Sequence, residues 1–213
     1  MSASNVSAKP SPAAMSRAKP VVIASCGSNL ASLVFALERL GVTAPVTEDP
    51  DEVRAASHVI LPGVGSAGAG MERLRRAGLA DVVPTLTQPV LGICLGMQLL
   101  FRSSEEDDTI GLGVIPGEVR RFPSSADYPV PHMGWNRVSL RGDSRLTAGL
   151  EEGGYAYFVH SYAAPVGPWT RAVSEYGIEF TAIVEHENFF GTQFHPERSS
   201  RFGALLLANF LKL

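Results

Sequence analysis

Short apolar runs alternate with amphipathic stretches along the first half of the chain, which predicts strands and helices in turn. Strands are predicted at Val21–Ser25, Thr43–Val46, His58–Leu61 and Val90–Ile93. Apolar residues recur at helical spacing from Asn29 until Gly41 ends the pattern. Helical stretches also include Met71–Arg76 and the segment through Val82 and Val83. This order is typical of a doubly wound α/β sheet.

The second half of the chain has a different texture, with short strands separated by glycine and proline from Gly111 onward. These strands are predicted at Glu118–Phe122, Trp135–Leu140, Ala156–Val159, Arg171–Glu175, Glu179–Val184 and Phe189–Gln193. A last helix is predicted at about Arg198–Leu211, and no internal repeat occurs. The fold class is therefore α/β, with a largely parallel central sheet flanked by helices and additional antiparallel strands in the C-terminal half.

The length and hydrophobic content of the chain favour one domain with one sizeable core. It has 213 residues, of which 45% are hydrophobic. Residues 1–20 are rich in Ser, Ala and Pro and lack acidic residues, so we expect a disordered extension ahead of a single domain at 21–213. Met15 is an alternative start, and a transit peptide is a minor alternative.

Composition excludes several classes of protein. The net charge of −3 argues against a nucleic-acid-binding surface. No apolar run is long enough to span a membrane, and residues 1–20 lack the apolar centre of a signal peptide, so we do not expect export. The two cysteines, Cys26 and Cys94, show no metal-ligand spacing and no disulfide framework. We expect no metal and no cofactor, and a reducing cytoplasm as the location.

Cys94 has the sequence context of a nucleophile. It lies in Gly92-Ile-Cys94-Leu-Gly96, where an apolar strand ends and a helix begins. Such a turn exposes its central side chain above the sheet, and the flanking glycines leave it uncrowded. The start of the helix favours the thiolate, and the amide of Leu95 is placed to donate to an oxyanion.

His195 and Glu197 complete a predicted triad with Cys94. They are two residues apart, so on an extended segment both side chains leave the same face, and the carboxylate can orient the imidazole. Taken alone, Cys94 reads as a core residue and His195 as a turn residue. Their joint context favours nucleophilic catalysis.

These motifs resemble a known family. Gly-Ile-Cys94-Leu-Gly-Met-Gln98 with His195-Pro-Glu197 resembles the class I glutamine amidotransferases, which have a flavodoxin-like fold. Within this family, three segments are similar to the glutaminase subunits of imidazole glycerol phosphate synthase, an enzyme of histidine biosynthesis. They are Leu61-Pro-Gly-Val-Gly65, Pro131-His-Met-Gly-Trp-Asn136 and Tyr157-Phe-Val-His-Ser-Tyr162. The similarity extends from about Val21 to the C-terminus.

The resemblance implies the remaining site residues. The backbone of Val64, together with Leu95, would form the oxyanion hole, and this hole would be incomplete until the partner's substrate binds. The implied glutamine-binding residues are Gly65, Gln98, Glu106, Ser161 and Tyr162. Glu106 would receive the α-ammonium group, and the backbone of Ser161 and Tyr162 the α-carboxylate.

The resemblance also implies a partner. In the family, ammonia passes to a (β/α)8-barrel cyclase, which would be a separate polypeptide here and form a heterodimer with this chain. The implied interface residues are Met133, Trp135, Asn136 and Arg198, with Arg198 where the family often has lysine. One departure affects this docking face, because Ala24-Ser-Cys-Gly-Ser-Asn29 replaces the family's Asp-Tyr-Gly-x-Gly-Asn.

Several alternatives remain open from the residues alone. Gln98 could be a solvated helix residue, Glu105–Asp108 a solvated acidic loop and Trp135 a core residue of its own strand. Gly63-Val-Gly65-Ser-Ala-Gly68 also fits a dinucleotide-binding pattern, but the next strand lacks the acidic residue which that pattern needs. Cys26 could be a second nucleophile, but no residue is identifiable as its base, so we expect it to have no catalytic role. Competing functions are the amidotransferase subunit of another synthase, a stand-alone cysteine hydrolase and a non-catalytic subunit.

Overall fold

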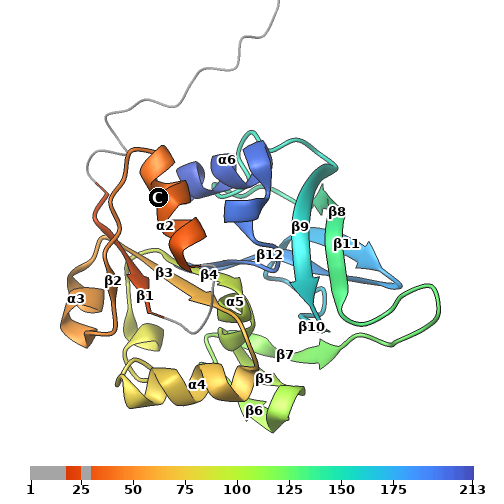
Figure 1. The fold of residues 1–213 in the computed structure, drawn as a ribbon, viewed down its shortest axis with the longest axis horizontal. Helices are drawn as coiled ribbons and strands as arrows, with labels where there is room; N and C mark the ends of the chain where they lie inside the picture. Colours follow the sequence, from red (N-terminus) through yellow and green to blue (C-terminus); the bar gives the residue numbers. More distant parts are fainter. Residues whose placement is uncertain (1–17, 25–29) are drawn as a thin grey trace, which may run out of the picture.

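A nine-stranded mixed sheet forms the centre of the molecule (Figure 1), and a smaller four-stranded sheet lies beside it. The structure is a computed structural model that describes residues 18–24 and 30–213. The large sheet has the order β2-β1-β3-β4-β13-β12-β11-β8-β9, and the small one β10-β7-β5-β6. The first five strands of the large sheet run parallel, and the other four continue it in antiparallel fashion. The expected fold class is therefore confirmed.

The elements follow one another along the chain as the sequence pattern predicts for an α/β fold. The strands of the large sheet are β1 Pro20–Ile23, β2 Val46–Thr47, β3 His58–Gly63, β4 Val90–Cys94, β8 His132–Leu140, β9 Gly154–His160, β11 Thr170–Tyr176, β12 Ile178–His186 and β13 Phe189–Thr192. The small sheet has β5 Phe101–Ser104, β6 Thr109–Ile110, β7 Ile115–Arg121 and β10 Tyr162–Ala163. The α-helices are α2 Leu30–Arg39, α3 Pro50–Ala55, α4 Ala67–Arg76, α5 Leu95–Leu99 and α6 Ser200–Phe210. Short 3-10 turns lie at Val83–Thr85, Glu106–Asp108 and Pro196–Arg198.

Helices cover both faces of the parallel strands, because successive strand residues point to opposite sides. On one face, Val22 and Ile60 pack in a core with residues of α2 and α6. On the other face, Val59 and Leu61 pack with residues of α3, α4 and α5. Figure 1 shows α2 and α6 on one side of the sheet and α4 on the other. The two cores hold the strands rigidly between the helices.

The parallel strands bring distant segments to one edge of the sheet. β4 lies between β3 and β13, with Gly63 paired to Cys94 and Ile93 paired to Thr192. All three strands therefore end side by side, and the chain after each of them enters the same region. Ligands of open α/β sheets bind at this carboxyl edge, so we expect the functional site there.

The predicted elements differ from the observed ones in a few places. β2 starts at Val46 rather than Thr43, and Pro45 before it has no N–H to donate to a ladder. The short helix α3 was not predicted, although Asp49 caps it and Pro50 opens it. The helix after Cys94 has only five residues, after which β5 begins, because the run Leu99-Leu-Phe101 suits helix and strand equally.

The N-terminal predictions fall mostly outside the described residues. Residues 1–17 of the expected extension lie there, as do Cys26 and the rest of the segment 25–29. β1 begins at Pro20, one residue before the expected domain start, and Lys19 N donates to Ser57 Oγ at 2.7 Å. Within residues 18–24 and 30–213, no helix is long and apolar enough to cross a bilayer.

Candidate active site

Cys94 occupies a strained turn between β4 and α5. Its φ of 54° and ψ of −111° lie outside the regions that side chains prefer. Strained backbone of this kind, held between a strand and a helix, is typical of a nucleophile elbow. The cysteine is buried, with its Sγ lying 3.8 Å from the carbonyl oxygen of Val159.

Gly96 allows this turn to pack tightly. A Cβ at this position would overlap the carbonyl oxygen of Leu61 in β3. No side chain other than hydrogen fits there unless the backbone moves. The glycine predicted to leave the turn uncrowded therefore has a specific role, which is to let α5 approach β3.

His195 follows β13 and lies at the same edge of the sheet. Its Nδ1 lies 2.9 Å from Glu197 Oε1, and both side chains are only 2% exposed. His195 N donates to the carbonyl of Tyr157, and Ser199 Oγ donates to the carbonyl of His195. The imidazole is therefore fixed from the backbone as well as from the carboxylate.

The electrostatics of the triad favour a protonated imidazole. Burial by itself would lower the pKa of His195, but its hydrogen bonds and charge interactions with Cys94 and Glu197 outweigh burial and raise that pKa. An imidazolium beside the sulfur stabilises the thiolate. The three predicted residues thus meet in an arrangement that can generate a nucleophile.

A cavity of about 380 Å³ opens over Cys94. Ten of the residues predicted for the site line it, namely Val64, Gly65, Cys94, Leu95, Gln98, Glu106, Ser161, Tyr162, His195 and Arg198. Pro131, Val159 and His160 complete the lining, and none of them was predicted to have a role. Glu197 lies behind His195. The cavity is large enough for a small amino acid such as glutamine.

Val64 and Gly65 approach the cysteine from the end of β3. Gly65 has a φ of 97°, in the left-handed region that favours glycine. Leu95 is the first residue of α5, where backbone N–H groups have no partner within the helix. Both predicted oxyanion segments therefore border the cavity that contains Cys94.

Glu106 is the one member of its acidic run that turns toward the cavity. Glu105, Asp107 and Asp108 are exposed, as the solvated-loop alternative predicts, whereas Glu106 is half-buried and its Oε2 accepts from Ala67 N at 2.8 Å. Burial raises the pKa of Glu106, and the charge of Asp107 adds to the rise, while the Ala67 hydrogen bond opposes it. The carboxylate is placed to receive a cationic group.

Gln98 is buried beneath the cavity, so the alternative of a solvated helix residue is wrong. Its Nε2 donates to the carbonyl of Tyr162 at 2.9 Å and to Gln193 Oε1 at 3.0 Å. Gln193 is fully buried, and its own Nε2 lies 3.8 Å from Cys94 Sγ. Sequence reasoning missed Gln193, although its position at the end of the predicted strand, two residues before His195, was a usable signal.

The expected interface residues divide between the two faces of β8. Met133 is 67% exposed and Trp135 is 54% exposed, so the alternative that Trp135 fills the core is wrong. Asn136 is half-buried on the opposite face of the strand. Arg198 is exposed, and its guanidinium carbon lies 4.4 Å from the centre of the Tyr157 ring.

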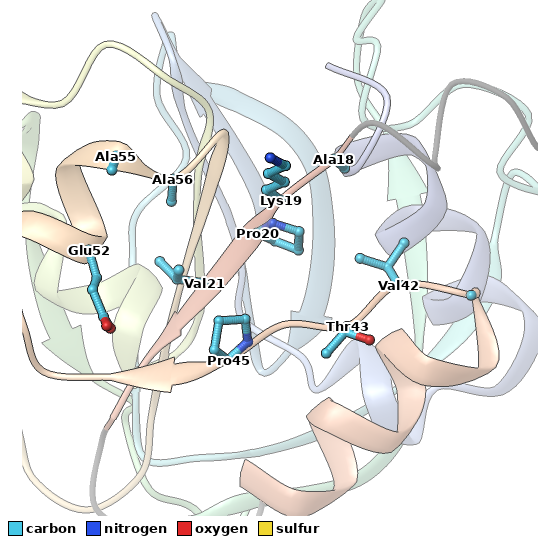
Figure 2. Close-up of a pocket in the computed structure, with 11 residues that line it drawn as sticks. Ala18, Lys19, Pro20, Val21, Val42, Thr43, Pro45, Glu52, Ala55 and Ala56 are labelled. Carbon is cyan, nitrogen blue, oxygen red and sulfur yellow. The ribbon is translucent and has the colours of Figure 1, made fainter.

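A larger cavity of about 560 Å³ lies at the amino end of β1, away from the carboxyl edge. It is lined by the start of β1, the segment after α2, and α3. Figure 2 shows its lining, which includes Lys19, Pro45 and Glu52 but no cysteine or histidine. Among the described residues, no cluster of His, Cys, Asp and Glu could hold a metal ion. The chemistry therefore points to the smaller cavity over Cys94.

Comparisons with known proteins agree with this geometry. The family "Glutamine amidotransferase class-I" matches residues 21–213. Imidazole glycerol phosphate synthase subunit HisH 2 of Legionella pneumophila strain Philadelphia 1 is 53% identical over 90% of this chain and 96% of its own length. Subunit HisH of Escherichia coli K12 is 52% identical over 91% of this chain and 99% of its own length. The chain belongs to the HisH branch of the class I glutamine amidotransferases.

A solved structure supports the fold of this HisH-branch chain. The crystal structure of a glutamine amidotransferase superposes with a TM-score of 0.70, at 19% identity, covering 91% of this chain and 97% of the other. At that identity the likeness concerns the fold alone. The HisH-branch chain is thus a glutamine amidotransferase by family.

Proposed function

We propose that the chain is the glutaminase subunit of imidazole glycerol phosphate synthase. It hydrolyses L-glutamine to L-glutamate and ammonia at Cys94. The ammonia passes to a separate (β/α)8 cyclase subunit that makes imidazole glycerol phosphate and aminoimidazole carboxamide ribonucleotide. The observation that carries the proposal is that Cys94 and His195 line one cavity, with Glu197 hydrogen-bonded to His195, in a chain of the HisH branch.

Acylation uses the ion pair between sulfur and imidazole. The Cys94 thiolate attacks the side-chain carbonyl carbon of glutamine, and the amides of Leu95 and Val64 stabilise the oxyanion. His195 gives its proton to the departing nitrogen, so that ammonia leaves and a glutamyl thioester remains. Glu197 keeps the imidazole in place through its hydrogen bond to Nδ1.

Deacylation reverses the role of the imidazole. Neutral His195 takes a proton from water, the hydroxide attacks the thioester carbonyl, and the sulfur leaves as thiolate. Glutamate is released, and the imidazolium and thiolate are restored together. No metal or cofactor is needed in this scheme.

The cavity provides a complementary site for the amino-acid end of glutamine. Glu106 offers a negative charge for the α-ammonium group, and the backbone of Ser161 and Tyr162 offers N–H groups for the α-carboxylate. Gly65 adds a further amide, and Gln98 supports the floor of the site. A substrate with one charge of each sign fits this arrangement better than a peptide does.

Transfer of ammonia requires a partner docked close to the cavity. Ammonia released into water at neutral pH becomes mostly ammonium and is no longer a nucleophile, so a sealed route has a chemical reason. Met133, Trp135 and Arg198 present an exposed apolar and cationic surface, and Asn136 lies behind it. We propose that the cyclase binds there, that residues 21–213 form the single domain involved, and that the complex is cytoplasmic.

The test mixes the purified chain with the cyclase subunit and its nucleotide substrate and measures glutamate release. We expect strong stimulation by the cyclase with nucleotide, and loss of release in Cys94→Ser. Cys94→Ser that still releases glutamate contradicts the role of the triad. Full glutamate release without the cyclase favours a stand-alone hydrolase instead.

A further inference from the structure

Two buried histidines lie at and behind the wall of the cavity, on neighbouring strands: His160 lines it, and His132 lies behind His160. His132 opens β8, His160 ends β9, and the two residues are paired in the register of the sheet. His132 Nδ1 lies 3.0 Å from His160 Nε2, and the residues are only 3% and 6% exposed. Neither residue has a place in the mechanism described above.

Aromatic side chains enclose this histidine pair. The His132 ring stacks on Tyr176 with its centroid at 4.2 Å and on Phe158 at 5.1 Å. The His160 ring lies 5.1 Å from Phe122 and 5.2 Å from Phe180. Packing of this kind fixes the orientation of both rings, so that their hydrogen bonds are made with defined nitrogens.

The positions of the ring protons follow from the hydrogen bonds. His160 Nδ1 lies 2.8 Å from the carbonyl oxygen of Tyr162, which can only accept, so Nδ1 carries the proton. In a neutral ring His160 Nε2 must then accept, and His132 Nδ1 must donate to it. His132 Nε2 is left as an acceptor, and Asn136 Nδ2 donates to it at 3.2 Å.

Both rings remain neutral at physiological pH, which keeps this direction fixed. Burial lowers the pKa of His132 to about 4. Burial is also the main reason that the pKa of His160 is lowered to about 3. The charges of His132 and His195 lower this pKa further, whereas the hydrogen bond to Tyr162 raises it. With neutral rings, the hydrogen bonds therefore all run in one direction: Asn136 donates to His132, His132 donates to His160, and His160 donates to Tyr162.

The inner end of this chain of hydrogen bonds reaches the cavity wall. The Tyr162 carbonyl accepts from His160 Nδ1 and also from Gln98 Nε2. Gln98 in turn binds Gln193, whose Nε2 lies 3.8 Å from Cys94 Sγ. Moving the Tyr162 carbonyl would thus disturb both the backbone that borders the cavity and the side chains under the cysteine.

The outer end is held inside the sheet. Asn136 Nδ2 also donates to the carbonyl of Glu175 at 2.8 Å, and Asn136 Oδ1 accepts from Arg137 N at 2.7 Å. All of these contacts lie within the chain, on the face of β8 opposite to Met133 and Trp135. The amide of Asn136 is therefore occupied in orienting His132.

We propose that Asn136, His132 and His160 are positioning residues for glutamine hydrolysis, which hold the Tyr162 carbonyl, and with it the glutamine-binding backbone, through one directional chain of hydrogen bonds. The proposal rests on the proposed glutaminase function. It assigns Asn136 an internal role, while the outward residues of the same strand are left to contact the cyclase.

Two substitutions of His160 separate positioning from packing. In His160→Asn the amide nitrogen lies near the former Nδ1 and can still donate to Tyr162, whereas His160→Gln places its amide near the former Nε2 and loses that donor. In the complex with cyclase and nucleotide, we expect His160→Gln to raise the KM for glutamine about tenfold with kcat within about threefold of wild type. His160→Asn should stay within about threefold in KM.

Asn136→Leu tests the outer end against a contact role. It removes the donor to His132 at similar volume, so we expect a KM for glutamine raised about threefold and an unchanged affinity for the cyclase. His186→Gln, at the end of β12, is the matched histidine control and should change neither value. A tenfold loss of cyclase affinity with an unchanged KM would place Asn136 in the interface and overturn its part of the proposal.

The tautomers give a readout that needs neither a variant nor activity. Nitrogen-15 NMR of the histidine rings in the wild-type chain should show the proton on Nδ1 in both His132 and His160. A proton on Nε2 of either ring, or equal KM values for the two His160 variants, overturns the proposal. If the wild-type complex released no glutamate at all, the proposed function would fail, and the NMR result would still decide the hydrogen-bond direction.

Discussion

Replacing Glu197 by glutamine isolates the electrostatic part of the triad. The substitution keeps the size of the side chain and keeps an oxygen that can accept from His195 Nδ1, now 2.9 Å from Glu197 Oε1. It removes a charge that is only 2% exposed. Position and packing are thus nearly preserved while the charge that stabilises the imidazolium is lost.

The magnitude follows from the burial of the pair. Two opposite unit charges 4 Å apart are worth about 4 kcal/mol at an effective dielectric constant of 20, and the retained neutral hydrogen bond returns about 1 kcal/mol or more. A net loss of about 2 to 3 kcal/mol in the transition state corresponds to a fall in kcat of about 30-fold to 150-fold.

The dependence of kcat on pH tests the role of the Glu197 charge independently of its magnitude. The pKa of His195 is raised by Cys94 and Glu197 against the opposing effect of burial, so the imidazolium persists to higher pH than in an ordinary histidine. Without the charge of Glu197, that pKa falls, and the alkaline limb of the kcat profile moves to lower pH.

The assay measures glutamate release by the complex at saturating glutamine over a range of pH. Glu118→Gln, which removes an exposed carboxylate 3.0 Å from Arg120, is the control and should leave kcat within about twofold. If Glu197→Gln kept more than a third of the wild-type kcat with an unmoved alkaline limb, the reasoning about its charge would be refuted.

Three further predictions concern packing, substrate binding and docking. Gly96→Ala should lower the free energy of unfolding by about 3 kcal/mol in urea titrations, because its Cβ meets a backbone carbonyl, whereas Gly70→Ala meets only leucine side-chain ends and should change it by less than about 1 kcal/mol. Burial raises the pKa of Glu106, so this carboxylate is protonated at a higher pH than an exposed glutamate is. As the pH is lowered, the KM for glutamine should therefore begin to rise at that higher pH, and a KM that does not change with pH would contradict the role of Glu106. Trp135→Ala should weaken cyclase binding about 30-fold in calorimetry, whereas substitution of the still more exposed Ile110 by alanine should not; equal effects would remove the proposed docking surface.

The fold and the residues of the triad could be predicted because they depend on local patterns, although Glu197 lies in a 3-10 turn at Pro196–Arg198 and not on the extended segment that was expected. Apolar runs of strand length mark β1, β3 and β4, and the glycines around Cys94 mark the elbow. Once these strands are parallel neighbours, their ends must meet. The meeting of Cys94 with His195 also requires β13 to lie beside β4, which the apolar runs alone do not specify.

The polar environment behind the site could not be predicted in the same way. The pairing of His132 with His160 depends on the antiparallel register of β8 and β9, which no short motif specifies. The side of β8 that Asn136 faces is likewise decided by the sheet. Gln193 could have been found from its spacing to His195, but its contact with Cys94 requires the neighbouring strand.

The most direct test of the account is to quench the working complex with acid during glutamine turnover and determine the mass of the peptide that contains Cys94. The account predicts a peptide heavier by one glutamyl group, attached through a thioester. Steady glutamate release with this peptide never modified would contradict nucleophilic attack by Cys94.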